Sequence, residues 1–181
     1  MSEASRAPAP APIVLAPHDA AWAHEFAREA QLIERALGDI LVDLQHIGST
    51  AIPGIVAKPV IDLLGAVTSI AALDAATPHL ESLGYEALGE FGLAGRRYFR
   101  KDNAAGVRTH QLHAYAAGSP DFQRHMDFRD YLRAHDDVAR AYASLKQDLA
   151  RQSEGDMRAY SKGKTQFIRD VEHRAATQWD R

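Results

Sequence analysis

The first third of the chain alternates between helix-like and strand-like patterns of apolar residues. After Asp19, apolar residues recur every three or four positions up to Gly38, which predicts an amphipathic helix with a C-terminal glycine cap. Residues 40–47 (ILVDLQHI) are rich in branched apolar side chains and predict a strand. Residues 59–67 (PVIDLLGAV) are almost entirely apolar, as is typical of a strand covered on both faces.

The rest of the chain predicts one more helix, three strands and a long helical segment. Residues 69–84 carry an apolar stripe between a serine N-cap and a glycine, which predicts a helix. Strands are expected at 85–88, 97–101 and 107–116, the last two joined as a hairpin. Ser119-Pro120 is typical of a helix start, and helices are expected from there on, with breaks near 135–136 and Gly155. This order predicts an α/β (α+β) fold: a mixed β-sheet with flanking helices and a C-terminal helical segment over one edge.

Composition bounds the domain organisation. We expect a single domain over 13–181, with a sheet core over about 13–117 and C-terminal helices over about 119–178. Residues 1–12 are rich in Ala and Pro and poor in large apolar side chains, which predicts a disordered tail. The chain has no cysteine, which excludes disulfides, thiolate zinc sites and cysteine nucleophiles.

Charge and hydropathy narrow the class of partner. The net charge is −3 and both signs are dispersed, which argues against a nucleic-acid partner. No stretch approaches the roughly 18 apolar residues of a membrane-spanning helix, and the N-terminal segment does not resemble a signal peptide. We therefore expect a cytoplasmic protein without a membrane partner; the pattern specifies no oligomeric state.

A candidate phosphate-binding turn follows the first predicted strand. Gly48 lets the backbone turn sharply and lets a phosphate approach the exposed amides, while Ser49 and Thr50 add hydroxyl groups. An ordinary Gly-Ser turn is the alternative interpretation.

Asp62 is the one charged residue inside the apolar strand 59–67. A carboxylate in such a strand is costly unless it is paired, hydrogen-bonded or bound to a metal. We favour a metal-binding or catalytic role, and a structural ion pair with Lys58 is the alternative.

The strand 107–116 contributes a third candidate. Two-residue periodicity divides its side chains into two sets, Gln111, His113 and Tyr115 on one face and His110, Leu112 and Ala114 on the other. His113 is therefore expected to line a cleft, although a hydrogen-bonded structural histidine is an equally good interpretation.

Taken together, the runs HIGSTAIPGIVAKPVIDLL, RRYFRKD, HQLHAY, FRDYLRAH and YSKGKTQFI resemble the GrpB-like family of predicted nucleotidyltransferases, over about 13–172. The resemblance implies a nucleotidyltransferase-like fold. In that superfamily a Gly-Ser loop binds the triphosphate and three acids on two strands hold two Mg²⁺ ions. Gly48 and Ser49 match the loop, and Asp62 matches the first acid.

This sequence departs from the superfamily pattern at the other two acids. Leu64 stands at the second position, and Gln111 and His113 occur where the third is expected. One carboxylate does not hold two hard divalent cations. Three possibilities follow: Asp62 and His113 share one metal ion, Asp62 acts as a general base, or the site is inactive.

Basic residues that could hold phosphate surround the predicted cleft. Lys58, Arg96, Arg97 and Arg100 flank it, and Lys164 is expected to face inward from the C-terminal segment, because it falls near an apolar stripe. The candidate nucleotide- or phosphate-binding residues are Gly48, Ser49, Thr50, Lys58, Arg97 and Lys164.

Two functions are consistent with these features. The first is a nucleotidyltransferase that moves a nucleotidyl or phosphoryl group from a nucleoside triphosphate to a small acceptor, with Asp62 and Ser49 catalytic and Mg²⁺ or Mn²⁺ at Asp62 and His113. The second is a catalytically inactive module that binds a nucleotide or another phosphorylated small molecule and serves regulation or the stability of a partner.

Overall fold

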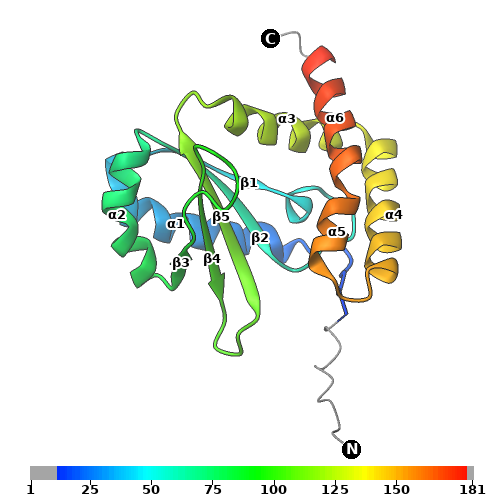
Figure 1. Cartoon of the computed structure of the whole chain (residues 1–181), viewed down its shortest axis with the longest axis horizontal. Coiled ribbons are helices and arrows are strands. Elements are labelled where there is room, and N and C mark those ends of the chain that lie inside the picture. Colours follow the sequence, from blue (N-terminus) through cyan, green and yellow to red (C-terminus); the bar gives the residue numbers. More distant parts are fainter. Residues whose placement is uncertain (1–11, 179–181) are drawn as a thin grey trace, which may run out of the picture.

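The computed structural model describes residues 12–178, which form a five-stranded mixed sheet with helices around it (Figure 1). The expected tail over 1–12 lies outside the described residues except for Pro12. The elements, in chain order, are α1 (Ala21–Leu37), η1 (Gly38–Ile40), β1 (Leu41–Ile47), η2 (Ser49–Ala51), β2 (Ile61–Val67), α2 (Ile70–Ser82), β3 (Tyr85–Ala87), β4 (Arg97–Asp102), β5 (Arg108–Ala116), α3 (Pro120–Ala134), α4 (Asp136–Gln152), α5 (Met157–Gly163) and α6 (Thr165–Gln178).

The mixed sheet expected from the sequence is confirmed, with strand order β1-β2-β5-β4-β3. The β2 and β5 strands are parallel, and the other neighbouring pairs are antiparallel. The register aligns one row of residues across four strands: Ile47, Asp62, Gln111 and Arg100. Side chains in such a row point to the same face, so the register decides which polar groups meet Asp62.

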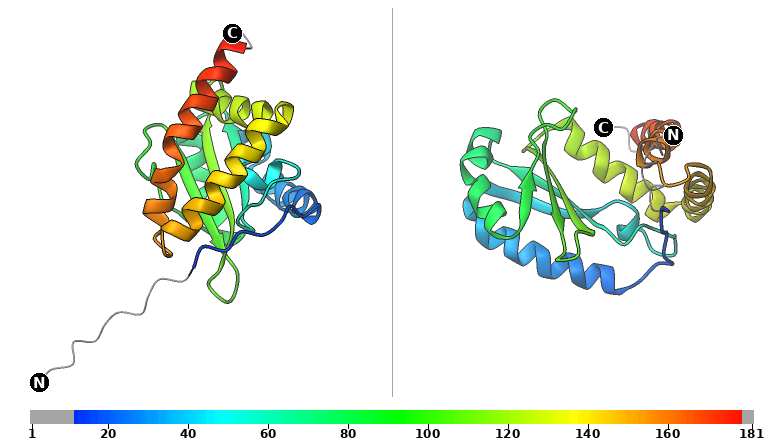
Figure 2. Two further views of the ribbon diagram at one scale, coloured as in Figure 1. Left: turned by 90° about the vertical axis from the view of Figure 1, so that its right-hand side faces the viewer. Right: turned by 60° about the horizontal axis from the view of Figure 1, so that its bottom comes forward.

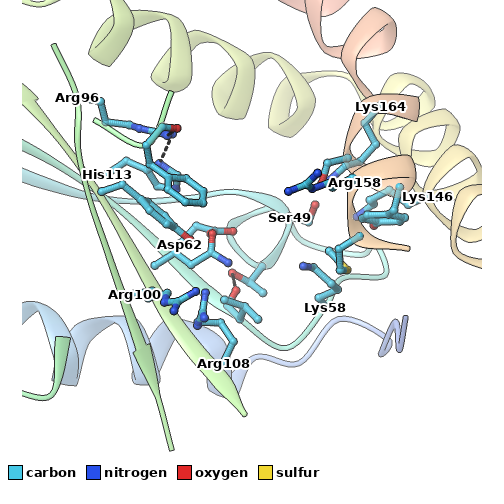
Figure 3. Close-up of a pocket in the computed structure, with 18 residues that line it drawn as sticks. Ser49, Lys58, Asp62, Arg96, Arg100, Arg108, His113, Lys146, Arg158 and Lys164 are labelled. Carbon is cyan, nitrogen blue, oxygen red and sulfur yellow. Dashed lines mark hydrogen bonds between the residues drawn. The ribbon is translucent and has the colours of Figure 1, made fainter. Parts of the chain in front are cut away.

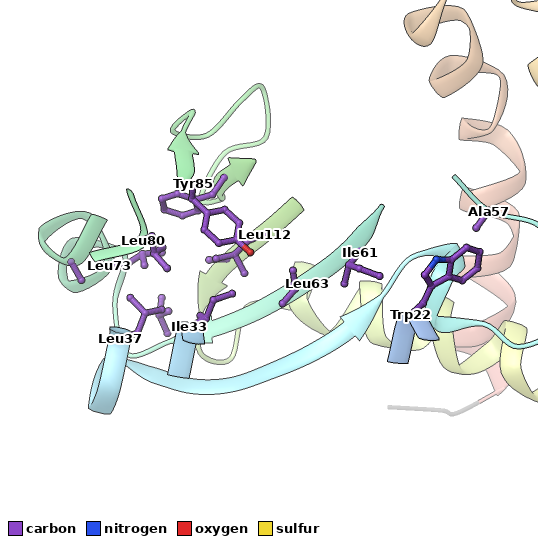
Figure 4. Close-up of a cluster of buried hydrophobic side chains, with 14 residues drawn as sticks. Trp22, Ile33, Leu37, Ala57, Ile61, Leu63, Leu73, Leu80, Tyr85 and Leu112 are labelled. Atoms are coloured by element: carbon purple, nitrogen blue, oxygen red, sulfur yellow. The ribbon is translucent and has the colours of Figure 1, made fainter. Parts of the chain in front are cut away.

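The two faces of the sheet are covered by different helices (Figure 2). Helices α1 and α2 pack on one face, where Ile33, Leu63 and Leu112 belong to the largest buried cluster (Figure 4). Helix α3 packs on the other face, over a smaller cluster of Ile47, Leu64 and Tyr115. The alternation predicted for β5 is therefore correct, because Leu112 enters the larger core while Tyr115 faces α3.

Local capping signals explain most element boundaries. The Ser69 hydroxyl accepts a hydrogen bond from the Ala72 amide at 3.1 Å, and Ser119 caps α3 in the same way. Gly38 ends α1 with a positive φ of 51°. The predicted breaks after α3 and after α4 are confirmed, and a further one at Lys164 separates α5 from α6, so the C-terminal segment has four helices. None of the helices within residues 12–178 is long and apolar enough to cross a membrane.

The C-terminal helices contact the sheet through α3 and the connection between β1 and β2 through α3 and α4, whereas the sequence predicted a position over one edge of the sheet. Arg129 of α3 donates to the His46 carbonyl at 3.1 Å, and Arg133 donates to the Ala51 carbonyl at 2.8 Å. Lys146 of α4 donates to the carbonyl of Val56. In the same region Ile52 and Ile55 are buried among apolar side chains of α3, α4 and α6.

Replacing Arg129 should test whether this attachment stabilises the fold. Arg129→Met keeps the side-chain length but leaves the buried His46 carbonyl and the Gln45 side-chain oxygen without their donor. We expect the free energy of unfolding to fall by roughly 2–4 kcal/mol in urea denaturation. The matched control Arg140→Met, at an exposed position of α4, should change it by less than about 0.5 kcal/mol. Equal effects of the two substitutions would mean that the contact does not carry the attachment.

Candidate functional site

A cleft of about 890 Å³ lies between the sheet and the C-terminal helices (Figure 3). Its walls come from the β1–β2 connection, β2, β4, β5, the residues before β4, and helices α4 and α5 with Lys164 between α5 and α6. Ser49, Asp62 and His113 all line it, so three of the candidates named from the sequence meet in one space.

The charge of the cleft is strongly unbalanced. Among the described residues 12–178, Asp62 is the only acid in its lining, whereas seven lining residues are basic: Lys58, Arg96, Arg100, Arg108, Lys146, Arg158 and Lys164. Two of these are matched by acids outside the cleft, because Arg100 pairs with Glu86 and Arg108 with Asp102. The excess occurs in a protein whose net charge is −3, so it is a local property of the cleft.

Gly48 and Asp62 are in direct contact. Gly48 follows β1 with φ at +71°, and a Cβ added to it would lie 2.3 Å from Oδ2 of Asp62. Only glycine therefore allows the turn to close over the carboxylate. The turn and the acid are therefore neighbours, and Ser49 and Asp62 line the same cleft.

The two hydroxyls of the turn have different environments. The Ser49 side chain forms a hydrogen bond with Tyr142 of α4. The Thr50 hydroxyl lies 2.9 Å from Nε2 of His46 and donates to the Val60 carbonyl at 3.4 Å. Both residues line the cleft, but both hydroxyls already have a hydrogen-bond partner within the protein, so the backbone of the turn is the better candidate for a phosphate contact.

Asp62 is a carboxylate that burial makes harder to ionise. Desolvation raises its pKa to about 6, and the positive charges of Lys58 and Lys164 oppose the shift. None of the ion pairs among residues 12–178 joins Asp62 to Lys58, so the structural salt bridge considered from the sequence is absent as a direct contact. Lys58 and Lys164 therefore influence Asp62 by electrostatic attraction across the cleft and not by direct contact.

The lysines of the cleft are also perturbed. Desolvation lowers the pKa of Lys164 to about 8 and that of Lys146 to about 7, and it lowers the pKa of Lys58. Lys164 lies 4.4 Å from the centroid of the Tyr160 ring, which confirms the inward orientation predicted for it. Lys162, two residues earlier, is exposed. Three desolvated ammonium groups in one cleft favour an anionic ligand.

Arg97 does not belong to the cleft, and its assignment to phosphate binding is wrong. Its guanidinium donates to both carboxylate oxygens of Asp74, at 2.6 and 2.7 Å, on the face covered by α2. Alternation along β4 is the reason, because it is Tyr98 and Arg100 that face the cleft.

Sequence reasoning missed three cleft cations, Arg108, Lys146 and Arg158. For Lys146 a signal existed: it falls between Tyr142 and Leu149 at helical spacing on an apolar face, where a lysine is unusual. Nothing in the local sequence distinguishes Arg108 or Arg158 from ordinary surface arginines.

The second acid of the superfamily pattern has no counterpart in this cleft. Leu64 is fully buried beneath α3 with Ile47 and Tyr115, and it does not line the cleft. Beside Asp62 on β5 stands Gln111, its register partner. An aspartate at position 64 would therefore bury a carboxylate in the apolar cluster instead of completing a metal site.

The residues present do not fit a resident metal centre. Within residues 12–178 there is no group of three or more His, Cys, Asp or Glu side chains placed to hold an ion. The Nδ1 atom of His113 lies 3.4 Å from Nη1 of Arg96, and burial, His125 and Arg96 lower the His113 pKa to about 3. The positive charge of the guanidinium repels a metal cation at this position. The expected metal site at Asp62 and His113 therefore lacks both a sufficient number of ligand side chains and a favourable local charge.

The contact between Gly48 and Asp62 can be tested with a matched pair of glycines. Gly48→Ala should destabilise the protein by roughly 2–4 kcal/mol, because the backbone is strained and the new methyl displaces the carboxylate. Gly54→Ala has a similar φ of +78° but meets nothing within 4 Å, so it should cost only about 1 kcal/mol. Thermal unfolding of both variants measures the difference, and equal losses would show that the carboxylate does not constrain the turn.

The cost of ionising Asp62 should appear as a pH-dependent effect on stability. At about pH 8 the native protein holds an ionised Asp62, although burial raises its pKa to about 6. The change in the free energy of unfolding caused by Asp62→Asn should therefore be more favourable at about pH 8 than at about pH 4, by roughly 2–3 kcal/mol. The gain should shrink as pH falls from about 6 to about 4, because in this range the native carboxyl binds a proton while the unfolded carboxyl stays ionised. Urea unfolding across this range checks it, with the exposed Asp39→Asn as control. A pH-independent effect would contradict a raised pKa.

Comparison with known proteins agrees with these observations. The family model described as "GrpB protein" matches residues 12–174. The chain is 42% identical over 154 residues to the UPF0157 protein YqkA of Bacillus subtilis, covering 85% of this chain but only 44% of YqkA, so it spans less than half of that relative. A crystal structure of the conserved protein GrpB from Enterococcus faecalis has a TM-score of 0.87 and 36% identity and covers 93% of this chain and all of that one. A structure of the Cid1 poly(U) polymerase has a TM-score of 0.45 and 12% identity, covering 74% of this chain and 45% of that one. The family model, which matches nearly the whole chain, and the match to the Enterococcus faecalis protein show that the chain belongs to the GrpB family.

Proposed function

We propose that the cleft binds a nucleotide, or another small molecule that carries several phosphate charges. The observation that carries this proposal is the set of seven basic residues around a single acid. Like charges at close range repel one another and are costly to desolvate, so such a set is stabilised by a polyanion. The cytoplasmic location expected from the composition would supply such ligands.

We further propose that the bound nucleotide reacts, with transfer of a nucleotidyl or phosphoryl group to a hydroxyl of a small acceptor. In nucleotidyl transfer the acceptor oxygen bonds to the α-phosphorus, the bond from that phosphorus to the bridging oxygen of the β-phosphate breaks, and pyrophosphate leaves. The acceptor proton goes to Asp62, whose pKa of about 6 suits a base that is ionised at neutral pH. Lys58 and Lys164 would stabilise the charge on the phosphates.

A binding module without catalysis is the second candidate, and a specific observation favours it. Leu64 and Gln111 stand where acids would complete the superfamily site, and Leu64 is built into the core. In this version the cleft holds the phosphorylated ligand and serves regulation or the stability of a partner. Asp62 then only limits how many negative charges the cleft accepts.

Two neighbouring lysines provide a matched test of the binding proposal. Lys164→Gln should weaken binding of ATP by roughly tenfold or more in calorimetric titration, because it removes a cleft cation. Lys162→Gln removes the same charge from an exposed position and should change the affinity by no more than about twofold. Affinity should also fall as salt rises. If both substitutions weaken ATP binding equally, the interaction is non-specific electrostatic attraction, and the proposed binding site in the cleft is contradicted.

Release of pyrophosphate or phosphate separates the enzyme from the binding module. Each nucleoside triphosphate is incubated with the protein, with or without Mg²⁺ or Mn²⁺, in the presence of small hydroxyl acceptors. The enzyme proposal expects release that Asp62→Asn abolishes without loss of nucleotide affinity. Stoichiometric binding with no release under any of these conditions would support the binding module.

A further inference from the structure

One aromatic residue of the cleft lining is strongly exposed. Phe91, in the segment between β3 and β4, lines the cleft with 61% of its surface exposed. It also has a positive φ of 45°, a conformation that a bulky residue rarely adopts and that costs of order 1–3 kcal/mol. A strained backbone that presents a large apolar ring to solvent calls for an explanation outside the packing of the core.

The segment that carries Phe91 is held in place by hydrogen bonds. Arg96 donates from Nη2 to the Phe91 carbonyl at 2.8 Å and from Nε to the Glu90 carbonyl at 3.2 Å. The Glu90 carboxylate accepts from the Gly95 amide at 2.7 Å, and the Tyr98 amide donates to the Gly89 carbonyl. Arg96 is buried, and these bonds occupy its guanidinium, so Arg96 positions Phe91. The exposed ring is therefore a fixed feature of the cleft wall.

Phe91 is backed by a second aromatic ring. Its ring stacks on Tyr98 of β4, with centroids 5.0 Å apart and an interplanar angle of 24°. The Arg96 guanidinium lies 5.1 Å from the Tyr98 centroid, and Tyr98 is buried. The result is a layered arrangement in which one face of Phe91 is supported and its surface toward the cleft stays available. A planar aromatic group is the partner that such a ring binds best.

The aromatic pair and the lysines lie on opposite sides of the cleft. Figure 3 shows Arg96, which holds the Phe91 backbone, on the sheet side near His113, whereas Lys58, Lys146 and Lys164 gather on the side of the C-terminal helices. Ser49 and Asp62 lie between the two groups. A ligand with a planar base at one end and phosphates at the other matches this order, with its sugar and first phosphate nearest Asp62.

We propose that Phe91, stacked on Tyr98, forms a nucleobase site, so that the ligand of the cleft is a nucleotide and not a sugar phosphate or an inorganic polyphosphate. This inference rests on the proposed function, because it divides the same cleft into a base end and a phosphate end. It assigns Phe91 the contact with the base, Arg96 the positioning of Phe91, and the lysines the contact with phosphate.

The test compares ligands with and without a base. ATP, GTP, CTP, UTP and inorganic tripolyphosphate are titrated calorimetrically, in one buffer, into the wild-type protein and into Phe91→Ala, Phe91→Leu and Phe91→Trp. The control is Leu93→Ala, which removes an exposed apolar side chain from the same segment at a position that does not line the cleft. Thermal unfolding checks that each variant folds. If Phe91→Ala does not fold, Phe91→Leu serves in its place, because leucine keeps much of the apolar volume of the side chain.

At least one nucleoside triphosphate should bind the wild-type protein more tightly than tripolyphosphate, by roughly 5- to 100-fold, which is the range of one base-stacking contact. Phe91→Ala and Phe91→Leu should remove most of this difference and leave the affinity for tripolyphosphate unchanged. Phe91→Trp should restore it, and Leu93→Ala should behave like the wild type.

Two results would overturn the nucleobase site while leaving the phosphate site intact: tripolyphosphate binding the wild type as tightly as every nucleotide, or Phe91→Ala weakening tripolyphosphate and nucleotides equally. The second result would mean that the ring only supports the wall of the cleft. If the wild type binds neither tripolyphosphate nor any nucleotide, the proposed function fails as well, and the nucleobase site fails with it.

Discussion

The helical wall of the cleft is held by basic side chains of the C-terminal helices, which donate to backbone carbonyls at the end of β1 and in the β1–β2 connection. Arg129 reaches the carbonyl of His46 at the end of β1, and Arg133 and Lys146 each reach one carbonyl of the connection that follows. Buried carbonyl groups need a donor, and a charged donor satisfies them strongly. These contacts fix the helices at a defined distance from the sheet, so that Lys164 faces the strand that carries Asp62. Without them the sheet would still have its apolar core on the α1 and α2 face, but the cleft would lose one wall.

Lys146 links this attachment to the chemistry of the site. Its ammonium group donates to the Val56 carbonyl and also lines the cleft, and desolvation lowers its pKa to about 7. An anion in the cleft would raise that pKa and strengthen the charge on the same group that holds the helix. Binding of the proposed ligand would thus be coupled to the attachment of α4 through one side chain. Asp62 is subject to opposing effects of the same kind. Burial raises its pKa, whereas the positive charges of Lys58 and Lys164 lower it.

Much of the site could be predicted from the sequence because its key features are local. A glycine directly after a strand, an acid within an apolar strand and a lysine near an apolar helical stripe are each visible in a short window, and Gly48, Asp62 and Lys164 all line or shape the cleft. The fold class followed from the order of such windows, and the mixed sheet is confirmed. Alternation along β5 also placed His113 in the cleft correctly.

The rest depends on relations between distant segments. The prediction that Arg97 lines the cleft was wrong because Arg97 points to the opposite face of β4, where it binds Asp74. The pairing of β4 with β5 decides which face of β4 is turned to the cleft. Leu64 shares its strand face with Asp62, but α3 covers it, and no local pattern shows where a later helix will lie. Phe91 sits in a segment without periodicity, and only its contacts with Tyr98 and Arg96 distinguish it from a surface residue.

The central claim is that one cleft holds the phosphates on its helical side and is the ligand site of the protein. The most direct measurement is a crystal structure of the protein with a non-hydrolysable nucleoside triphosphate analogue. The account predicts phosphate oxygens within hydrogen-bond distance, about 2.7–3.2 Å, of the ammonium groups of Lys58 and Lys164. The account would be contradicted by a structure, obtained at a saturating concentration of the analogue, in which the cleft is empty or the analogue binds elsewhere on the molecule.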